Sequence, residues 1–136
     1  TYHHFSVVMS KSRRMCLFSA CIINGGQSRP TDRVGWKLDP RIPAERQIIK
    51  ECYGSSPKFS RGHMTRREDP AWGPDDLAAQ LGSDDSMHVT NVTPQMQTFN
   101  APIWLELRVV NWVVVRAPIC AVVSGCQASF SPSRCT

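Results

Sequence analysis

The sequence predicts one α+β domain, in which short strands and a few short helices share a core. The chain has 136 residues, close to the size of one average domain. Hydrophobic residues make up 41% and charged residues 20%, a balance that suits a folded core rather than a disordered or fibrous chain. Apolar runs of strand length alternate with segments that carry helix-start signals, and we find no internal repeat.

The first part of the chain is predicted to begin with two strands. Phe5–Met9 and Met15–Ile23 are apolar and rich in β-branched or aromatic residues, and a polar segment separates them. We expect them to pair in antiparallel fashion. Residues 27–43 contain three prolines and suit a long ordered loop or a short edge strand. Pro43–Cys52 is predicted to form a brief helix.

The middle of the chain is predicted to alternate between extended and helical segments. Phe59–Thr65 has the composition of a short strand. Pro74–Leu81 begins with a proline and two aspartates, which favour a helix N-terminus, and we expect Gly82 to end this helix. Met87–Val92 favours a short extended segment that ends at Thr93-Pro94.

A second helix is predicted over Phe99–Leu107, because its apolar residues follow a helical period and Pro102 lies in the first turn. With about 3.6 residues per turn, Asn100, Trp104 and Arg108 lie on one side of this helix. Glu106 lies on another face.

The cysteine spacing argues against a zinc site, and the apolar runs are too short for a membrane span. The six cysteines form no C-x-x-C pair and have no histidine at the short offsets of zinc sites, so a zinc site is not expected. Cys16 and Cys21 are predicted to be buried thiols within an apolar strand. No run reaches the roughly 18 apolar residues of a membrane span, so no membrane partner is expected, and no targeting signal is visible.

The charge distribution changes near position 107. The net charge is +5, and residues 1–107 contribute 13 basic less 11 acidic side chains, or +2. Residues 108–136 contribute three arginines and no acid or lysine. A modest basic excess of this kind is compatible with a polyanionic partner without requiring one.

A basic cluster surrounds a single histidine, His63. Four basic side chains lie within ten positions around it: Lys58, Arg61, Arg66 and Arg67. Such a cluster attracts phosphate, and a neutral imidazole can accept a proton near neutral pH. The alternative is a solvated basic surface that Glu68 and Asp69 partly neutralise, with a histidine that has no chemical role.

Two asparagines further along the chain are candidate ligands or structural residues. A hard cation such as Mg²⁺ prefers oxygen ligands and retains much of its water, so Asn91 or Asn100 could contribute one ligand. Taken singly, both are more typical of turns and helix caps. His88 offers a further alternative as a catalytic dyad with Asp84 or Asp85, or as a loop histidine.

The order of these residues is more specific than any one of them. Three blocks follow one another: Ser60-Arg61-Gly62-His63-Met64, Asn91-Val-Thr-Pro-Gln95 preceded by Asp85, and Asn100-Ala-Pro-Ile-Trp104 within Phe99–Leu107. Together they resemble the DNA/RNA non-specific endonuclease family of the ββα-metal superfamily. The resemblance spans about residues 32–107 and includes the segment Asp32–Pro40.

The resemblance implies a ββα-metal nuclease-like domain that is incomplete at its C-terminus, and a metal-dependent endonuclease that hydrolyses the phosphodiester bonds of DNA and RNA. It implies that His63 is the general base and that Arg61 contacts phosphate. Asn91 would support the active site, and Asn100 would bind Mg²⁺ or another divalent cation such as Mn²⁺. Lys58, Arg66 and Arg67 would bind nucleic acid. Members of the family are often secreted or periplasmic, but this sequence does not assign a compartment.

One departure from the family pattern lies on the second predicted helix. The family has a glutamate where this chain has Arg108, and a guanidinium there would oppose a cation. We therefore expect residues 1–107 to form a partial endonuclease domain and residues 108–136 to be an atypical tail. The tail is either unrelated to the family or a divergent part in which Val109–Val115 is a strand. The alternative function is a catalytically inactive, nucleic-acid-binding remnant.

Overall fold

A computed structural model describes residues 1–53, 59–104 and 120–125. Five strands lie in this part of the chain: β1 (Phe5–Ser10), β2 (Met15–Ile23), β3 (Phe59–His63), β4 (Val92–Met96) and β5 (Cys120–Gly125). The helical elements are α1 (Asp76–Ser86) and the short turns η1 (Gly25–Gln27), η2 (Ala44–Arg46), η3 (Val89–Asn91) and η4 (Phe99–Trp104). The predicted α+β class is confirmed. No helix among these residues is long and apolar enough to cross a bilayer.

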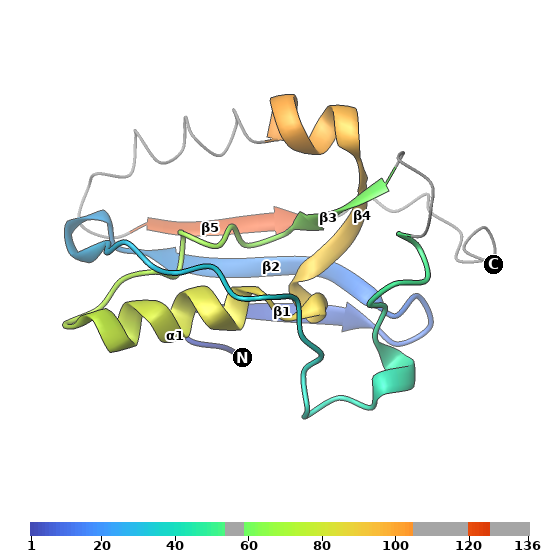
Figure 1. Ribbon diagram of the computed structural model, residues 1–136, viewed down its shortest axis with the longest axis horizontal. Helices are drawn as coiled ribbons and strands as arrows, with labels where there is room; N and C mark the ends of the chain where they lie inside the picture. The colour runs from blue at the N-terminus through green and yellow to red at the C-terminus, as the bar shows by residue number, and fades with distance from the viewer. Residues whose placement is uncertain (54–58, 105–119, 126–136) are drawn as a thin grey trace.

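A three-stranded antiparallel sheet carries the strands in the order β1-β2-β5 (Figure 1). Phe5 pairs with Cys21, and a register shift between Val8 and Met9 marks a bulge in β1. The predicted pairing of the first two strands is thus confirmed. β5 pairs with β2 along its whole length, so residues 120–125 of the expected tail belong to this sheet. Val109–Val115 and Arg108 lie outside the described residues.

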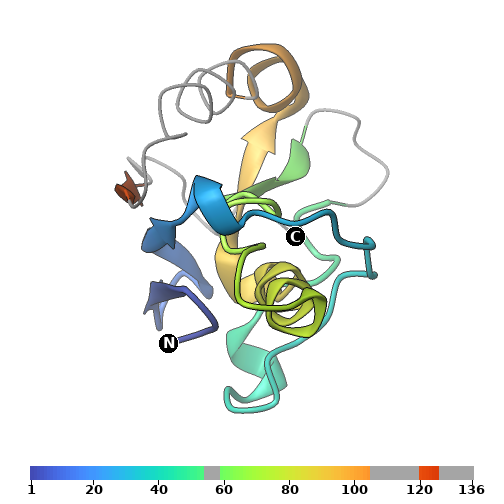
Figure 2. The ribbon, with the colours of Figure 1, turned by 90° about the vertical axis from the view of Figure 1, so that its left-hand side faces the viewer.

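The core lies on one face of this sheet. Tyr2, Phe5, Cys21 and Ile23 form a buried apolar cluster, because alternate side chains of a strand point to the same face. Cys16 and Cys21 are buried thiols, as predicted, whereas Cys52 is disulfide-bonded. Figure 2 shows α1 end-on at one side of the sheet.

Helix α1 starts as predicted but does not end where predicted. Asp75 caps its N-terminus, and its side-chain oxygen accepts a hydrogen bond from the Ala78 N–H at 2.8 Å. The helix continues through Gly82 to Ser86, so the predicted stop at Gly82 is wrong. A β-carbon at Gly82 would lie 2.1 Å from the carbonyl oxygen of Pro70. This glycine allows a close backbone contact rather than a helix end.

Strands β3 and β4 form a second, two-stranded antiparallel sheet, and η4 follows β4. Met87–Val92 was expected to be extended, but Val89–Asn91 forms η3 and β4 begins only at Val92, so this prediction is wrong. The predicted end at Thr93-Pro94 is also wrong, because Pro94 lies inside β4 opposite Arg61. The Met64 N–H donates to the Asn91 carbonyl at 2.9 Å. Hydrogen-bonded pairs recur at every second residue of an antiparallel ladder, so the next ones are Gly62 with Thr93 and Ser60 with Gln95. Pro94 falls between them, where no ladder hydrogen bond requires its missing N–H.

Two expected helices differ from the prediction in type and length. Pro43–Cys52 contains only the single turn η2. The helix expected from Phe99 begins there, but its described part, η4, is a π-helix. A π-helix has a wider turn than an α-helix, so the face assignments based on 3.6 residues per turn do not apply to Asn100 and Trp104. Glu106 lies outside the described residues.

Candidate active site

His63 is the last residue of β3 and lies half-buried beside an aromatic ring. The centroid of its imidazole lies 4.6 Å from that of the Trp36 indole, and the two rings are inclined by 38°. The next residue, Met64, is bound through its N–H to the Asn91 carbonyl. The backbone that carries the imidazole is therefore fixed on its C-terminal side.

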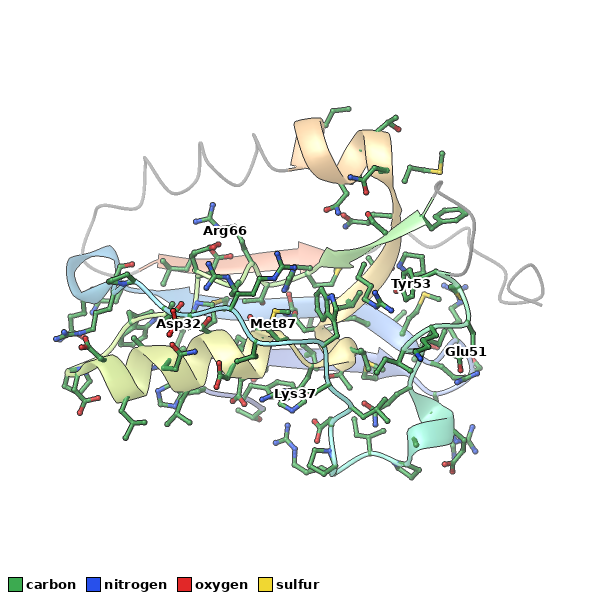
Figure 3. The ribbon with its side chains drawn as sticks, viewed as in Figure 1. Asp32, Lys37, Glu51, Tyr53, Arg66 and Met87 are labelled. Carbon is green, nitrogen blue, oxygen red and sulfur yellow. The ribbon has the colours of Figure 1, made fainter. Side chains whose placement is uncertain are left out.

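Arg61 lies two residues before His63, so both side chains leave β3 on the same face. Its Nε donates to the carbonyl oxygen of Ile49 at 3.1 Å, and its Nη2 donates to the same oxygen. The guanidinium lies 4.7 Å over the ring of Tyr53. Burial raises the pKa of the Tyr53 hydroxyl above its ordinary value, so the ring below the cation stays neutral. Tyr53 and Glu51 are labelled in Figure 3, and the segment 49–53 to which they belong supplies the contacts to Arg61.

Asn91 is completely buried, and its side chain binds the backbone of two segments, at Thr65 and at Ser86. Its Oδ1 accepts from the Thr65 N–H at 2.9 Å. Its Nδ2 donates to the carbonyl oxygens of Thr65 and Ser86, at 2.8 and 3.0 Å. The side chain thus ties the segment after His63 to the end of α1, and it does not reach the surface.

Asn100 lies on the other side of β3. Its Nδ2 donates to the hydroxyl oxygen of Ser60 at 2.9 Å. Ser60 is three residues before His63 in the strand, and its side chain therefore points to the opposite face. In this structure the hydrogen bond directs the Asn100 amide toward the face that does not carry His63.

Gly62 and Gln95 explain why the first two sequence blocks meet. Gln95 pairs with Ser60, and its side chain lies across Gly62. A β-carbon at Gly62 would lie only 2.0 Å from Cδ of Gln95. A larger residue before His63 would therefore displace the Gln95 side chain.

The donor atoms present fit a weakly held hard cation. Among the described residues, no three His, Cys, Asp or Glu side chains form a metal-binding group. Mg²⁺ commonly keeps several waters and binds through one or two protein oxygens. Because Nδ2 of Asn100 is bound to Ser60, its Oδ1 is the atom that remains for a cation. Asn100 thus offers one amide oxygen, on the face of β3 opposite His63.

The predicted basic cluster is largely ion-paired. Arg66 contacts Glu68 at 3.1 Å and Asp69 at 3.4 Å. Arg67 contacts Glu68 at 2.7 Å and donates to the carbonyl oxygen of Thr31 at 3.0 Å. Glu68 and Asp69 therefore partly neutralise the basic cluster, as the alternative interpretation of the sequence expected. Lys58 lies outside the described residues.

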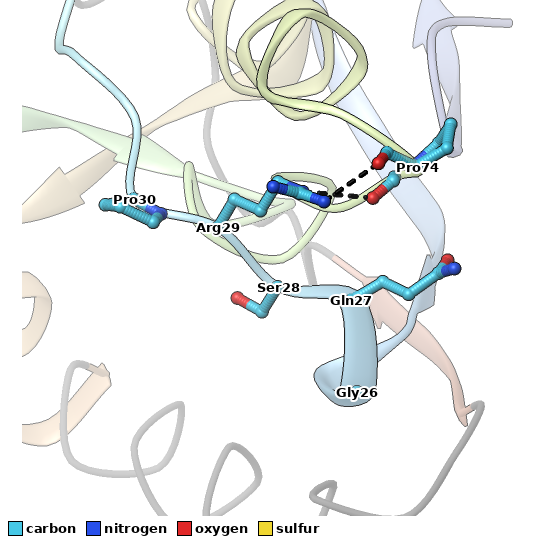
Figure 4. A pocket seen from close by; sticks show the side chains of 7 residues that line it. Gly26, Gln27, Ser28, Arg29, Pro30 and Pro74 are labelled. Carbon is cyan, nitrogen blue, oxygen red and sulfur yellow. Dashed lines mark hydrogen bonds between the residues drawn. The ribbon is translucent and has the colours of Figure 1, made fainter.

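His88, the alternative catalytic candidate, and a surface pocket lie apart from these residues. His88 is 8% exposed, and its Nδ1 lies 2.9 Å from the Asp85 carbonyl oxygen, as suits a structural histidine. A surface pocket of about 370 Å³ lies beside η1 (Figure 4). Arg29 lines this pocket and donates to the carbonyl oxygens of Gly73 and Pro74. None of the predicted site residues lines it.

Sequence reasoning missed the partners of the site residues. Trp36 lies in the segment of family resemblance but had no assigned role. Ser60 and Gln95 belong to two of the motifs, and they also had no assigned role. The signal for Gln95 was present, since a glycine directly before a functional histidine indicates a close approach. No signal in the sequence indicated the contact of Trp36 with His63.

Three comparisons relate this chain to known proteins. The model of a family described as DNA/RNA non-specific endonuclease matches residues 1–115. The curated "Uncharacterized protein y4fB" of Sinorhizobium fredii is 40% identical over 117 residues, a match that spans 78% of this chain and 18% of that protein.

The fold also matches a chain in the crystal structure of the EndoG/EndoGI complex. The TM-score is 0.76 over 92% of this chain and 51% of that chain, with 17% sequence identity. At this identity the likeness shows the fold. The chain thus spans about half of the structural relative and less than a fifth of the curated one.

Proposed function

Because the chain belongs to the DNA/RNA non-specific endonuclease family, we propose that it is a metal-dependent endonuclease that hydrolyses phosphodiester bonds in DNA and RNA. The observation that supports this most is the position of His63 and Arg61 on one face of β3. One side chain can accept a proton and the other can bind a phosphate oxygen, which are two needs of phosphodiester hydrolysis.

His63 is proposed as the general base. A neutral imidazole near pH 7 takes the proton of the attacking water and leaves a hydroxide directed at phosphorus. Asn91 serves as a positioning residue, because it holds the backbone of Thr65 and does not touch the surface. The fixed backbone after β3 limits where the imidazole can lie.

Arg61 is proposed to stabilise the negative charge on the phosphate oxygens. The contacts to Ile49 use Nε and Nη2, and Nη1 carries two further N–H donors. The Tyr53 ring and the Ile49 carbonyl hold the guanidinium in one place before substrate binds. Arg61 therefore contributes a prepositioned charge rather than a flexible one.

Asn100 is proposed as the protein ligand of a divalent cation, Mg²⁺ or Mn²⁺, through its Oδ1. When bound, the cation would supply positive charge beside the phosphate and lower the pKa of a coordinated water. Lys58, Arg66 and Arg67 are proposed to contact the nucleic-acid backbone. Phosphates would compete there with Glu68 and Asp69 for the arginines. Because basic side chains that neutralise phosphates release counterions, binding should weaken strongly as salt increases.

The test is cleavage of plasmid DNA and of RNA with Mg²⁺ and with EDTA. We expect cleavage with Mg²⁺ and none with EDTA. His63→Ala should lower the cleavage rate by about a hundredfold or more, since general-base catalysis contributes at least that factor. Filter-binding affinity should change little, because the imidazole acts on water. Cleavage at the wild-type rate by His63→Ala would refute its role as base.

A second function is favoured by one observation, the hydrogen bond that directs Asn100 toward the face opposite His63. A chain in which these residues do not converge would bind nucleic acid without cutting it. Filter binding in EDTA together with no cleavage in Mg²⁺ or Mn²⁺ would support this remnant. Metal-dependent cleavage that Asn100→Ala abolishes and Asn100→Asp retains would exclude it.

A further inference from the structure

The backbone on the C-terminal side of Trp36 is held by neighbouring elements. The Lys37 N–H donates to the Met87 carbonyl at 3.2 Å, and the Val89 N–H donates to the Lys37 carbonyl at 3.0 Å. Figure 3 shows Lys37 and Met87 close together where the loop crosses the end of α1. The residue after Trp36 is therefore tied to η3 and to the end of α1.

The loop is anchored a second time before Trp36. The Asp32 N–H donates to Oε1 of Gln80 at 3.0 Å, and Nε2 of Gln80 donates back to the Asp32 carbonyl at 3.1 Å. Gln80 belongs to α1, so α1 anchors the loop before the indole, and Met87 and η3 anchor it after the indole. Such double anchoring of a loop holds the side chain between the anchors in a limited range of positions.

The indole of Trp36 lies against the imidazole of His63, at 4.6 Å between centroids and an inclination of 38°. Both side chains are half-buried, and Nε2 of His63 has almost no contact with solvent. The outer torsion of a histidine side chain is broad, so a β-strand alone does not fix the orientation of the ring. A neighbouring aromatic face restricts that torsion.

We propose that Trp36 is a positioning residue for His63. Its indole holds the imidazole in one orientation and limits its exposure to bulk water. This inference rests on the proposed role of His63 as base. Trp36 acts through His63 and contacts no reacting atom, so it should affect the chemical step rather than the binding of nucleic acid.

The test compares Trp36→Ala with Trp36→Phe, which retains an aromatic ring. The first measurement is the rate at which diethyl pyrocarbonate modifies His63, followed by peptide mass spectrometry without substrate or metal. We expect a severalfold faster modification in Trp36→Ala and a rate near wild type in Trp36→Phe. If Trp36→Ala does not fold in a thermal melt, Trp36→Leu replaces it, because leucine fills more of the space but has no ring.

The second measurement is steady-state cleavage of an oligonucleotide with Mg²⁺. We expect kcat to fall about tenfold to a hundredfold in Trp36→Ala, the scale of a misplaced catalytic group, while KM stays within twofold. Trp36→Phe should recover most of kcat. A rise in KM alone would mean that Trp36 binds substrate, and unchanged modification of His63 would mean that the indole does not shield it. Either result overturns the proposal.

The chain contains a matched control pair. Trp72 stacks on His4 with centroids 3.5 Å apart and rings inclined by 7°. Trp72→Ala should speed the modification of His4 and leave that of His63 and the value of kcat unchanged. If the wild-type protein does not cut nucleic acid, the modification rates still decide whether Trp36 positions His63. Failure of the proposed function and failure of this inference are thus distinguishable.

Discussion

At the scale of single residues, Gly62 and Gly82 face different kinds of neighbour. The atoms nearest to a β-carbon at Gly62 all belong to the Gln95 side chain, Cδ at 2.0 Å and Cγ at 2.5 Å, and this side chain can change its rotamer. A β-carbon at Gly82 would meet the Pro70 backbone carbonyl at 2.1 Å, which cannot move without its chain. Replacing each glycine by alanine should therefore lower the free energy of unfolding by different amounts.

We predict that Gly82→Ala destabilises the protein, although helix propensity alone favours alanine by about 1 kcal/mol. The overpacked backbone contact should cost about 1–3 kcal/mol or more, which exceeds that gain. Gly62→Ala is the matched control and should cost less, because Gln95 can shift. Urea unfolding with a fixed m-value measures both changes. A Gly82→Ala variant more stable than wild type would show that α1 and Pro70 separate easily.

Candidate residues for the site could be named from the sequence, but their contacts could not. His63 and Arg61 were recognisable because the motif places them two apart on a strand. Asn91 was also recognisable, yet nothing in the sequence showed that its amide is buried against Thr65 and Ser86. Side-chain partners depend on how distant segments pack, and a local pattern does not contain that information.

At the scale of elements, Arg67 connects three segments of the chain. Its guanidinium binds Glu68 at 2.7 Å, the Thr31 carbonyl at 3.0 Å and the Ser83 hydroxyl at 3.5 Å. Ser83 belongs to α1 and Thr31 to the loop that leads to Trp36. The side chain is only 22% exposed, so it is placed to hold this loop against α1.

We predict that Arg67→Ala lowers the free energy of unfolding by about 1–3 kcal/mol, because it leaves partly buried acceptors without a charged donor. Arg33→Ala removes an exposed arginine of the same loop and is the matched control, with a change expected within about 0.5 kcal/mol. Thermal melts and filter binding are measured on both. Weaker binding is expected from the proposed contact of Arg67 with nucleic acid, and an unchanged melting temperature would contradict its role in holding the loop against α1.

The elements themselves were largely predictable, and each error has a local physical cause. Apolar runs rich in β-branched and aromatic residues predicted β1 and β2, and the charged start of α1 predicted its N-terminus. The end of α1 was wrong because Gly82 packs on Pro70, and the end of β4 was wrong because Pro94 falls at a position without a ladder hydrogen bond. Proline and glycine have these effects only in the context of a neighbouring segment.

At the scale of the whole molecule, the N-terminal segment is joined to the rest by a buried polar network. The Tyr2 hydroxyl bonds to the Asp39 carboxylate and to Thr90, and Arg41 donates to Asp39 at 2.7 Å. The Arg41 guanidinium also lies over the Tyr2 ring at 4.5 Å. The network joins segments 37 and 88 positions apart in the sequence, so no local pattern could have predicted it.

This network should set the pH range over which the protein is stable. Hydrogen bonds from Arg41 hold the pKa of Asp39 well below its usual range, against the opposing effect of burial. In the unfolded chain Asp39 titrates at about pH 4, so its contribution to stability is complete above about pH 5 and is lost progressively as the pH falls below that value. Burial raises the pKa of the Tyr2 hydroxyl, so the unfolded phenol ionises first and stability falls above about pH 10.

We predict that the urea midpoint is nearly flat between about pH 5 and 10 for these two groups and falls on both sides. Asp39→Asn should lower the midpoint at pH 7, because it leaves Arg41 and Tyr2 without the carboxylate. It should also reduce the further drop between pH 7 and pH 3, since the titrating group is gone. Asp76→Asn, which removes a carboxylate whose side chain is 86% exposed, should retain the wild-type drop. An equal drop in Asp39→Asn would show that other carboxylates govern acid stability.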